Sequence, residues 1–142
     1  MTPDPAALTL LAVPGSFAVC KLPPTAPIPA WATAGPLFNI TRTPDELSVV
    51  CDDSVVPPGV TCEKGWRAVR VSGSMPFTLV GVLAALTVPV AQAGVGVFAF
   101  STFDTDYLLV KADNWETALA ALRVAGHTVA EAGKVAARSA GG

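Results

Sequence analysis

The pattern of apolar and polar residues is clearest in the C-terminal half of the chain. Trp66–Val71 (WRAVRV) alternates and is rich in valine, which predicts a β-strand. Leu79–Ala93 is rich in Ala, Leu and Val and is longer than an ordinary strand, so it predicts a helix. We expect Ser74 or Thr78 to cap this helix, and Pro89 to bend it because proline donates no backbone hydrogen bond.

A β-hairpin is expected after this helix. A single strand over Val95–Lys111 would exceed the usual strand length of about 3–10 residues, and the polar block STFDTD interrupts it. The segment therefore predicts two strands, Val95–Phe100 and Tyr107–Lys111, joined by a turn around Phe103–Thr105.

A second helix and a short strand complete this half. A cap within Asp113–Asn114 precedes a run in which Trp115, Leu119 and Leu122 are spaced by four and three positions, as on one face of a helix. The run HTVAE (127–131) predicts a last strand. The order is β-α-β-β-α-β, the ferredoxin-like arrangement of an α+β fold.

The N-terminal half looks like a shortened relative of the C-terminal half. Its predicted elements are two strands around a turn at Pro14 and Gly15 (8–13 and 16–22), a short helix (about 29–34) and a pair of strands (36–43 and 46–52) around Thr43–Asp45.

An internal repeat is also indicated. A shift of sixty positions places Phe38–Val50 over Phe98–Val110, with an apolar strand, a polar turn and an apolar strand in both. With residues 51–65 as a linker, we expect two βαββαβ units packed together: a shortened, strand-rich N-terminal unit (1–63), a C-terminal unit (64–130) and a tail (131–142).

Composition excludes several classes of function. The chain is 51% hydrophobic and 14% charged with a net charge of −2, and it has no cluster of Lys and Arg, so nucleic-acid binding is not expected. No charged residue lies between Arg70 and Asp104, but Pro89 and Gly94 break this interval, and no membrane span is expected. No phosphate-binding or nucleotide-binding glycine motif is present, so no cofactor is predicted.

The cysteines and the N-terminus favour a cytoplasmic protein. Cys20, Cys51 and Cys62 are an odd number at spacings that match no zinc signature, so we expect them to be reduced. The N-terminal segment lacks the positive charge of a secretory signal peptide.

The candidate chemistry lies at Asp104 and Asp106. Two neighbouring carboxylates could divide acid and base roles, bind a metal ion or stabilise a polar turn. No third carboxylate or histidine lies near them in the sequence, and the only histidine, His127, is expected to pack or cap at a helix end. Neither catalysis nor a metal site is therefore expected.

The segment KGWRAVRVSGSMPFTLVGVLAALTVPVAQAGVGVFAFSTFDTDYLLVK resembles the small bacterial ACT-domain proteins. Their ACT units are similar to those of the CASTOR arginine sensors and the aspartate kinases. The first-half segments FAVCKL, APIPAWA and TRTPDELSVVC are similar to the N-terminal unit of that group. The resemblance implies βαββαβ units that bind amino acids, commonly at interfaces between units, and that carry no catalysis themselves.

The resemblance also implies where a ligand would bind. The site would lie where the loop before the first helix of the C-terminal unit meets the following hairpin, with contributions from the hairpin of the first half. Its implied residues are Ser74, Met75, Pro76, Phe77, Thr78, Ser101, Thr102, Phe103, Asp104, Thr105, Asp106, Thr41, Arg42 and Thr43.

The expected function is thus that of a regulatory sensor without catalytic activity. It would bind a small, amino-acid-like ligand, form a homodimer and pass the ligand state to a regulated protein partner. A structural assembly module without a ligand is the alternative, and a small acid/base enzyme using Asp104 and Asp106 is a more distant one.

Overall fold

The computed structural model describes residues 4–76 and 80–131, which form two compact units. One unit is Gly15–Trp66, and the other combines the described residues up to Pro14 with those from Arg67 onward. The predicted ranges 1–63 and 64–130 therefore differ from the observed units, because the start of the chain belongs with the C-terminal unit. Each unit has its own cluster of buried apolar residues.

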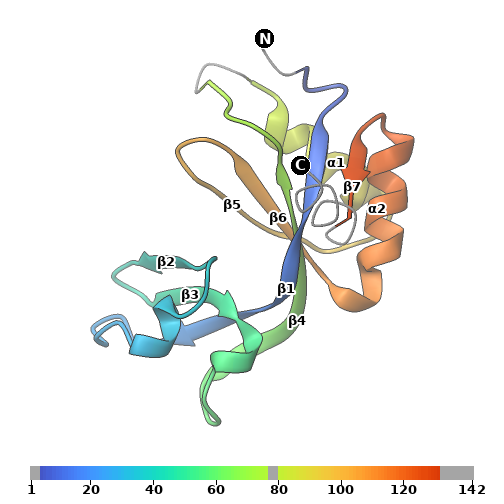
Figure 1. The fold of residues 1–142 in the computed structure, drawn as a ribbon. Helices are drawn as coiled ribbons and strands as arrows, with labels where there is room; N and C mark the ends of the chain where they lie inside the picture. The colour runs from blue at the N-terminus through green and yellow to red at the C-terminus, as the bar shows by residue number, and fades with distance from the viewer. Residues whose placement is uncertain (1–3, 77–79, 132–142) are drawn as a thin grey trace, which may run out of the picture. The chain divides into compact units, whose positions relative to one another are not determined.

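The N-terminal unit is built almost entirely of strands (Figure 1). Its sheet has the order β2-β3-β1-β4, so that its first strand lies between its third and its fourth, as in a ferredoxin-like unit. Short 3₁₀ helices stand where such a unit has α-helices. The elements are β1 (Thr9–Leu22), η1 (Ala30–Thr33), β2 (Asn39–Arg42), β3 (Leu47–Asp52), η2 (Asp53–Val55) and β4 (Thr61–Val71).

The C-terminal unit carries the two α-helices. Both β1 and β4 continue into it, and its sheet has the order β5-β6-β4-β1, with β7 paired in parallel to the start of β1. The β-α-β-β-α-β order predicted for this half is therefore confirmed, with β1 inserted beside β4. The further elements are α1 (Val82–Gln92), β5 (Phe98–Ser101), β6 (Asp106–Lys111), η3 (Ala112–Asn114), α2 (Trp115–Val124) and β7 (Thr128–Ala130).

The turn predicted at Pro14 and Gly15 is wrong, because β1 runs unbroken through both residues. The pairing explains how the strand tolerates them. Thr9–Leu11 pairs with β7 and Phe17–Leu22 pairs with β3, so Pro14 lies between the two paired stretches, where its missing N–H breaks neither ladder. Gly15 takes a φ of 102° in this connection.

Helix α1 begins at Val82, later than predicted, and Ser74 does not cap it. Gly81 is the N-cap, in the left-handed conformation with a φ of 85°, and Ser74 lies well before it. Thr78 lies outside the described residues. Asn114 is the N-cap of α2, as predicted, although its side chain makes no capping hydrogen bond. No helix in residues 4–76 and 80–131 has both the length and the apolar character to span a membrane.

The buried His127 connects three elements of the C-terminal unit. Pro89 lies inside α1 and has no N–H to donate to the carbonyl of Ala85, four residues earlier. His127 Nε2 lies 3.0 Å from this carbonyl, and Nδ1 accepts a hydrogen bond from the backbone N–H of Leu8 at 3.0 Å. Because Nδ1 is the acceptor, the proton lies on Nε2, which donates to Ala85. The packing role expected for His127 is confirmed.

This arrangement makes His127 and Pro89 energetically coupled. In His127→Phe, the Leu8 N–H and the Ala85 carbonyl lose their partner inside the protein, and we expect the free energy of unfolding to fall by about 2 kcal/mol or more. In the background of Pro89→Ala, residue 89 regains an N–H for the Ala85 carbonyl, so the same histidine substitution should cost about 1 kcal/mol less. Urea unfolding of the four proteins measures both values. Equal costs of the histidine substitution in the two backgrounds would contradict the coupling.

Candidate functional site

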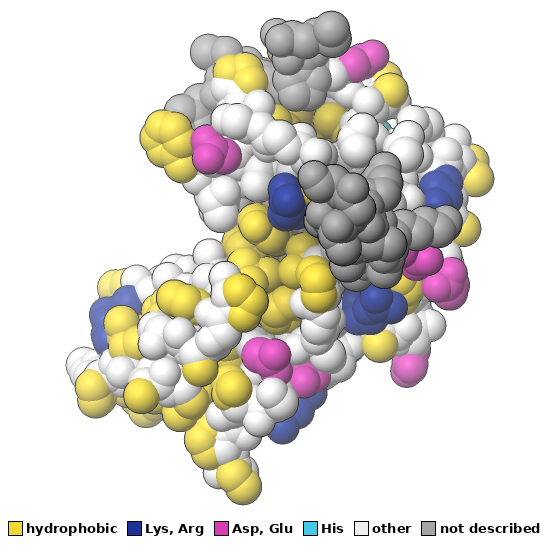
Figure 2. All heavy atoms as spheres, in the orientation of Figure 1, with side chains coloured by type: hydrophobic (Ala, Val, Ile, Leu, Met, Phe, Trp, Pro, Cys, Tyr) yellow, Lys and Arg dark blue, Asp and Glu magenta, His cyan; other side chains and the backbone are white. Residues whose placement is uncertain are grey.

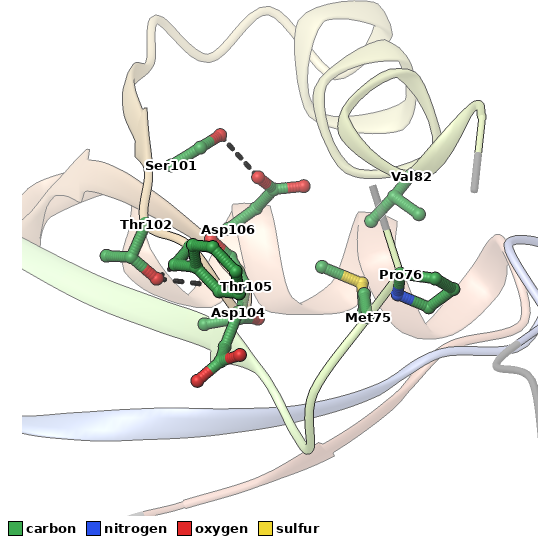
Figure 3. A pocket seen from close by; sticks show the side chains of 9 residues that line it. Met75, Pro76, Val82, Ser101, Thr102, Asp104, Thr105 and Asp106 are labelled. Carbon is green, nitrogen blue, oxygen red and sulfur yellow. Dashed lines mark hydrogen bonds between the residues drawn. The ribbon is translucent and has the colours of Figure 1, made fainter. Parts of the chain in front are cut away.

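A pocket of about 170 Å³ opens on the C-terminal unit (Figure 3). It lies between the loop that follows β4, the first turn of α1 and the turn of the β5–β6 hairpin. Nine residues line it: Met75, Pro76, Val82, Ser101, Thr102, Phe103, Asp104, Thr105 and Asp106.

Hydrogen bonds to backbone carbonyls hold the hairpin turn in place. Thr102 N donates to the Thr105 carbonyl at 2.8 Å, and the buried hydroxyl of Thr105 donates to the carbonyl of Val71 on β4 at 2.8 Å. The loop after β4 is tied to the same turn, because Met75 N donates to the Asp104 carbonyl at 2.8 Å. The two polypeptide segments that form the pocket are therefore fixed to each other through main-chain groups.

The two carboxylates of the pocket have different surroundings. Asp104 is exposed and accepts a hydrogen bond from Ser74 Oγ at 3.0 Å. Asp106 is half-buried and accepts a hydrogen bond from Ser101 Oγ. Figure 3 shows the Asp106 carboxylate on the side of the turn that faces α1 and the Asp104 carboxylate on the opposite side. Asp106 is therefore the acid directed toward the helix end of the pocket.

The walls of the pocket combine apolar and acidic groups. Met75, Pro76 and Val82 form the apolar side, and none of the described lining residues is Lys or Arg. At the tip of the β5–β6 hairpin, Figure 2 shows a hydrophobic side chain (yellow) next to an acidic side chain (magenta). The N-cap of α1 is Gly81, which has no side chain to accept from the first amide groups of the helix. Amide groups at a helix start can donate to a ligand. The pocket thus offers two negative charges, backbone donors and an apolar surface.

Most of the residues predicted for the C-terminal unit meet at this pocket. The loop residues Met75 and Pro76 and the whole turn from Ser101 to Asp106 line it, and Ser74 bonds to Asp104 at its rim. Phe77 and Thr78 lie outside the described residues. Val82 was missed, because the helix was expected to start at Leu79 and Val82 was then an ordinary interior position.

The three residues predicted from the first half, Thr41, Arg42 and Thr43, are not at this pocket. They belong to the N-terminal unit and do not line the pocket. The Arg42 guanidinium donates to the carbonyl of Pro24 and, at 2.8 Å, to that of Ala26. Both carbonyls lie in the loop before η1 of the same unit, so Arg42 is already engaged within its own unit.

The β2–β3 and β5–β6 hairpins are related by an offset of 59 positions, one fewer than the sequence shift suggested. The pair Arg42–Leu47 corresponds to the pair Ser101–Asp106. The turns share their bonding as well: Thr43 N donates to the Glu46 carbonyl at 2.9 Å, as Thr102 N does to the carbonyl of Thr105. Arg42 therefore stands at the place of Ser101.

The chemistry of this site follows from the described residues that line it. No group of three or more His, Cys, Asp or Glu side chains among them is placed to hold a metal ion. His127 is not among the lining residues, and both its ring nitrogens are engaged with backbone groups. What the pocket can do chemically is accept hydrogen bonds from a cationic donor and donate them from backbone amides.

Comparison with known proteins identifies the family. A family model described as an ACT domain matches residues 61–124, and a second model, described as an N-terminal domain, matches residues 15–58. A crystal structure of a protein from Agobacterium tumefaciens is 35% identical, with a TM-score of 0.84, over 88% of this chain and 93% of that one. The chain belongs to the same family as this protein and is an ACT-like protein.

More distant structures share the fold. A protein of unknown function from Vibrio cholerae, described as a possible transport protein, is 16% identical with a TM-score of 0.70, over 86% of this chain and 92% of that one. The regulatory subunit of aspartate kinase from Thermus thermophilus is 17% identical with a TM-score of 0.51, over 83% of this chain and 93% of that one. No curated protein sequence matches the chain.

Proposed function

We propose that the protein is a regulatory module that binds a small amino acid in the pocket of its C-terminal unit and has no catalytic activity. The observation that carries the proposal is the half-buried Asp106, which faces the first turn of α1 across a pocket lined by no described cation. The ACT domain match and the fold shared with a regulatory subunit of aspartate kinase support a regulatory role.

An amino acid fits the chemistry of the two ends of the pocket. Its ammonium group would donate to the Asp106 carboxylate in a charge-assisted hydrogen bond. Its carboxylate would accept from the amides at the start of α1, where the helix dipole also favours a negative charge. Met75 and Val82 would contact the aliphatic part of the ligand.

The size and charge of the pocket limit the ligand. About 170 Å³ is smaller than the range of about 300–1,000 Å³ that is typical of drug-sized ligands, so a single amino acid is the appropriate size. The carboxylates of Asp104 and Asp106 would repel an acidic side chain. Neutral and basic amino acids are therefore favoured over aspartate and glutamate.

The N-terminal unit would not hold a second site of this kind. We propose that the two units are tandem ACT-like units, since the sheet order and the paired turns are alike. In the N-terminal unit the arginine at the place of Ser101 reaches its own loop, so the corresponding space is used by Arg42. One ligand per chain is then expected. The protein would pass its ligand-bound or ligand-free state to a protein partner in the cytoplasm.

A screen of the twenty amino acids by thermal unfolding tests the proposal. A ligand at one hundred times its dissociation constant stabilises the folded state by about 2.7 kcal/mol, so a few neutral or basic amino acids should raise the unfolding temperature. Asp106→Asn should abolish this rise, whereas Asp104→Asn should weaken it less because that carboxylate faces away from α1.

The matched control is Asp45→Asn, which changes an exposed aspartate in the turn of the first hairpin. It should leave the ligand-induced rise unchanged. A flat screen at millimolar concentrations, or an equal rise with Asp106→Asn, would count against amino acid binding at this pocket.

Assembly is the second candidate function, and the edge strand β5 favours it. This strand is the last in the order of the sheet, next to β6. No charged residue lies between Arg70 and Asp104 to discourage pairing with another chain. We therefore propose a homodimer in which β5 strands of two copies pair in an antiparallel manner.

Sedimentation over a range of concentrations tests the dimer. Val97→Lys places a charge at an exposed position next to β5, and it should shift the equilibrium toward the monomer by tenfold or more. Val124→Lys, at an exposed position on α2, should leave the equilibrium unchanged. A wild-type protein that is monomeric at its highest soluble concentration would refute the dimer. A dimer without any ligand response would favour the assembly module.

A further inference from the structure

Three cysteines lie together in the core of the N-terminal unit. Cys20 on β1 and Cys51 on β3 are buried, and the partly exposed Cys62 on β4 packs against the same apolar cluster. In the sheet, β1 lies between β3 and β4. The three thiols therefore come from three neighbouring strands, with Cys20 in the middle.

The central thiol belongs to the same apolar cluster as Cys51, and Cys62 packs against that cluster. The pKa of the Cys20 thiol is raised to about 12, chiefly by burial and in addition by the neighbouring Cys51 and Cys62. At neutral pH, Cys20 is thus a protonated thiol that dissolved reagents do not reach. Cys62 is the member of the cluster with access to solvent.

The arrangement disfavours two of the possible uses of such a cluster. A metal ion needs ligands that converge on one point, and no such group of three exists among the described side chains. A Cys20–Cys51 disulfide is also disfavoured. Cys20 is paired with Val49 and Cys51 with Ala18, so the two cysteines are diagonal neighbours on adjacent strands. The Cα atoms of such neighbours lie about 7–8 Å apart, whereas a disulfide needs a Cα–Cα distance below about 7 Å.

We propose that Cys62 and Cys20 form a redox-active pair, in which Cys62 reacts first with a hydroperoxide and Cys20 then closes a disulfide between β4 and β1. This goes beyond amino acid binding and does not rest on it, since the cluster lies in the other unit. The order of the two steps follows from access: the oxidant reaches Cys62, and Cys20 reacts only with the sulfur beside it.

The chemistry balances with one equivalent of hydrogen peroxide. The Cys62 thiolate attacks one peroxide oxygen, the O–O bond breaks, and the products are a sulfenic acid and hydroxide, which takes up a proton to become water. The Cys20 sulfur then attacks the Cys62 sulfur, the S–S bond forms, and hydroxide leaves and takes the Cys20 proton as water. The two thiols lose two electrons, and the peroxide gains them.

The link would join the two strands that both units share. Both β1 and β4 contribute residues to the N-terminal and to the C-terminal unit. A disulfide between them would cross-link the unfolded chain, so the oxidised protein should unfold at a higher temperature than the reduced one. A thiol reductant would reverse the change.

The experiment treats the full chain with hydrogen peroxide and maps the products by mass spectrometry. Before oxidation, a thiol reagent at pH 8 should label only Cys62 in the native protein and all three cysteines in urea. After oxidation, the wild type should lose two hydrogens and yield a Cys20–Cys62 linked peptide. Cys51→Ala should behave as the wild type does.

Two variants test the order of the steps. Cys62→Ser should form no disulfide under the same treatment, and it changes only the partly exposed member of the cluster. Cys20→Ala should stop at a sulfenic acid on Cys62, which dimedone traps. A Cys20–Cys51 link, a disulfide between two copies through Cys62, or three thiols that remain free after peroxide treatment would each overturn the proposal.

Discussion

A proline inside helix α1 creates the constraint on which the C-terminal unit depends. Pro89 has no N–H, so the carbonyl of Ala85 needs a donor from outside the helix, and His127 supplies it. The same ring accepts the amide proton of Leu8, which precedes β1. One buried side chain therefore joins the first strand, the first helix and the start of the last strand, and it does so in a single tautomer.

The hydrogen bonds of His127 also position one wall of the pocket. Helix α1 carries Val82 at the pocket wall, so the position of its first turn depends on how the helix is held against the sheet. On the opposite side, Thr105 holds the hairpin to the carbonyl of Val71, and Met75 holds the loop to that of Asp104. The walls are thus fixed by hydrogen bonds to main-chain carbonyls, while the Asp104 carboxylate is exposed and that of Asp106 is half-buried. Such a pocket is organised before a ligand arrives.

Sequence patterns predicted the elements that depend on local signals. The β5–β6 hairpin and α2 were found because strand length and helical spacing are local properties of the chain. The unbroken β1 was missed, because only its pairing with β7 and β3 shows that Pro14 lies between ladders. Of the candidate site, the turn from Ser101 to Asp106 was found, whereas Val82 depends on a helix start at Gly81 that no residue pattern indicated.

The two hairpins show how one backbone turn supports two different chemistries. Their pairing and their turn hydrogen bonds are equivalent, so the difference between them lies in their side chains, among them the pair next to the turn. The first hairpin has Arg42 opposite Leu47, and the guanidinium reaches carbonyls of its own loop. The second has Ser101 opposite Asp106, which adds a negative charge and removes the arginine. The proposed ligand would therefore bring a positive charge to the turn of the second hairpin, where the first hairpin has Arg42.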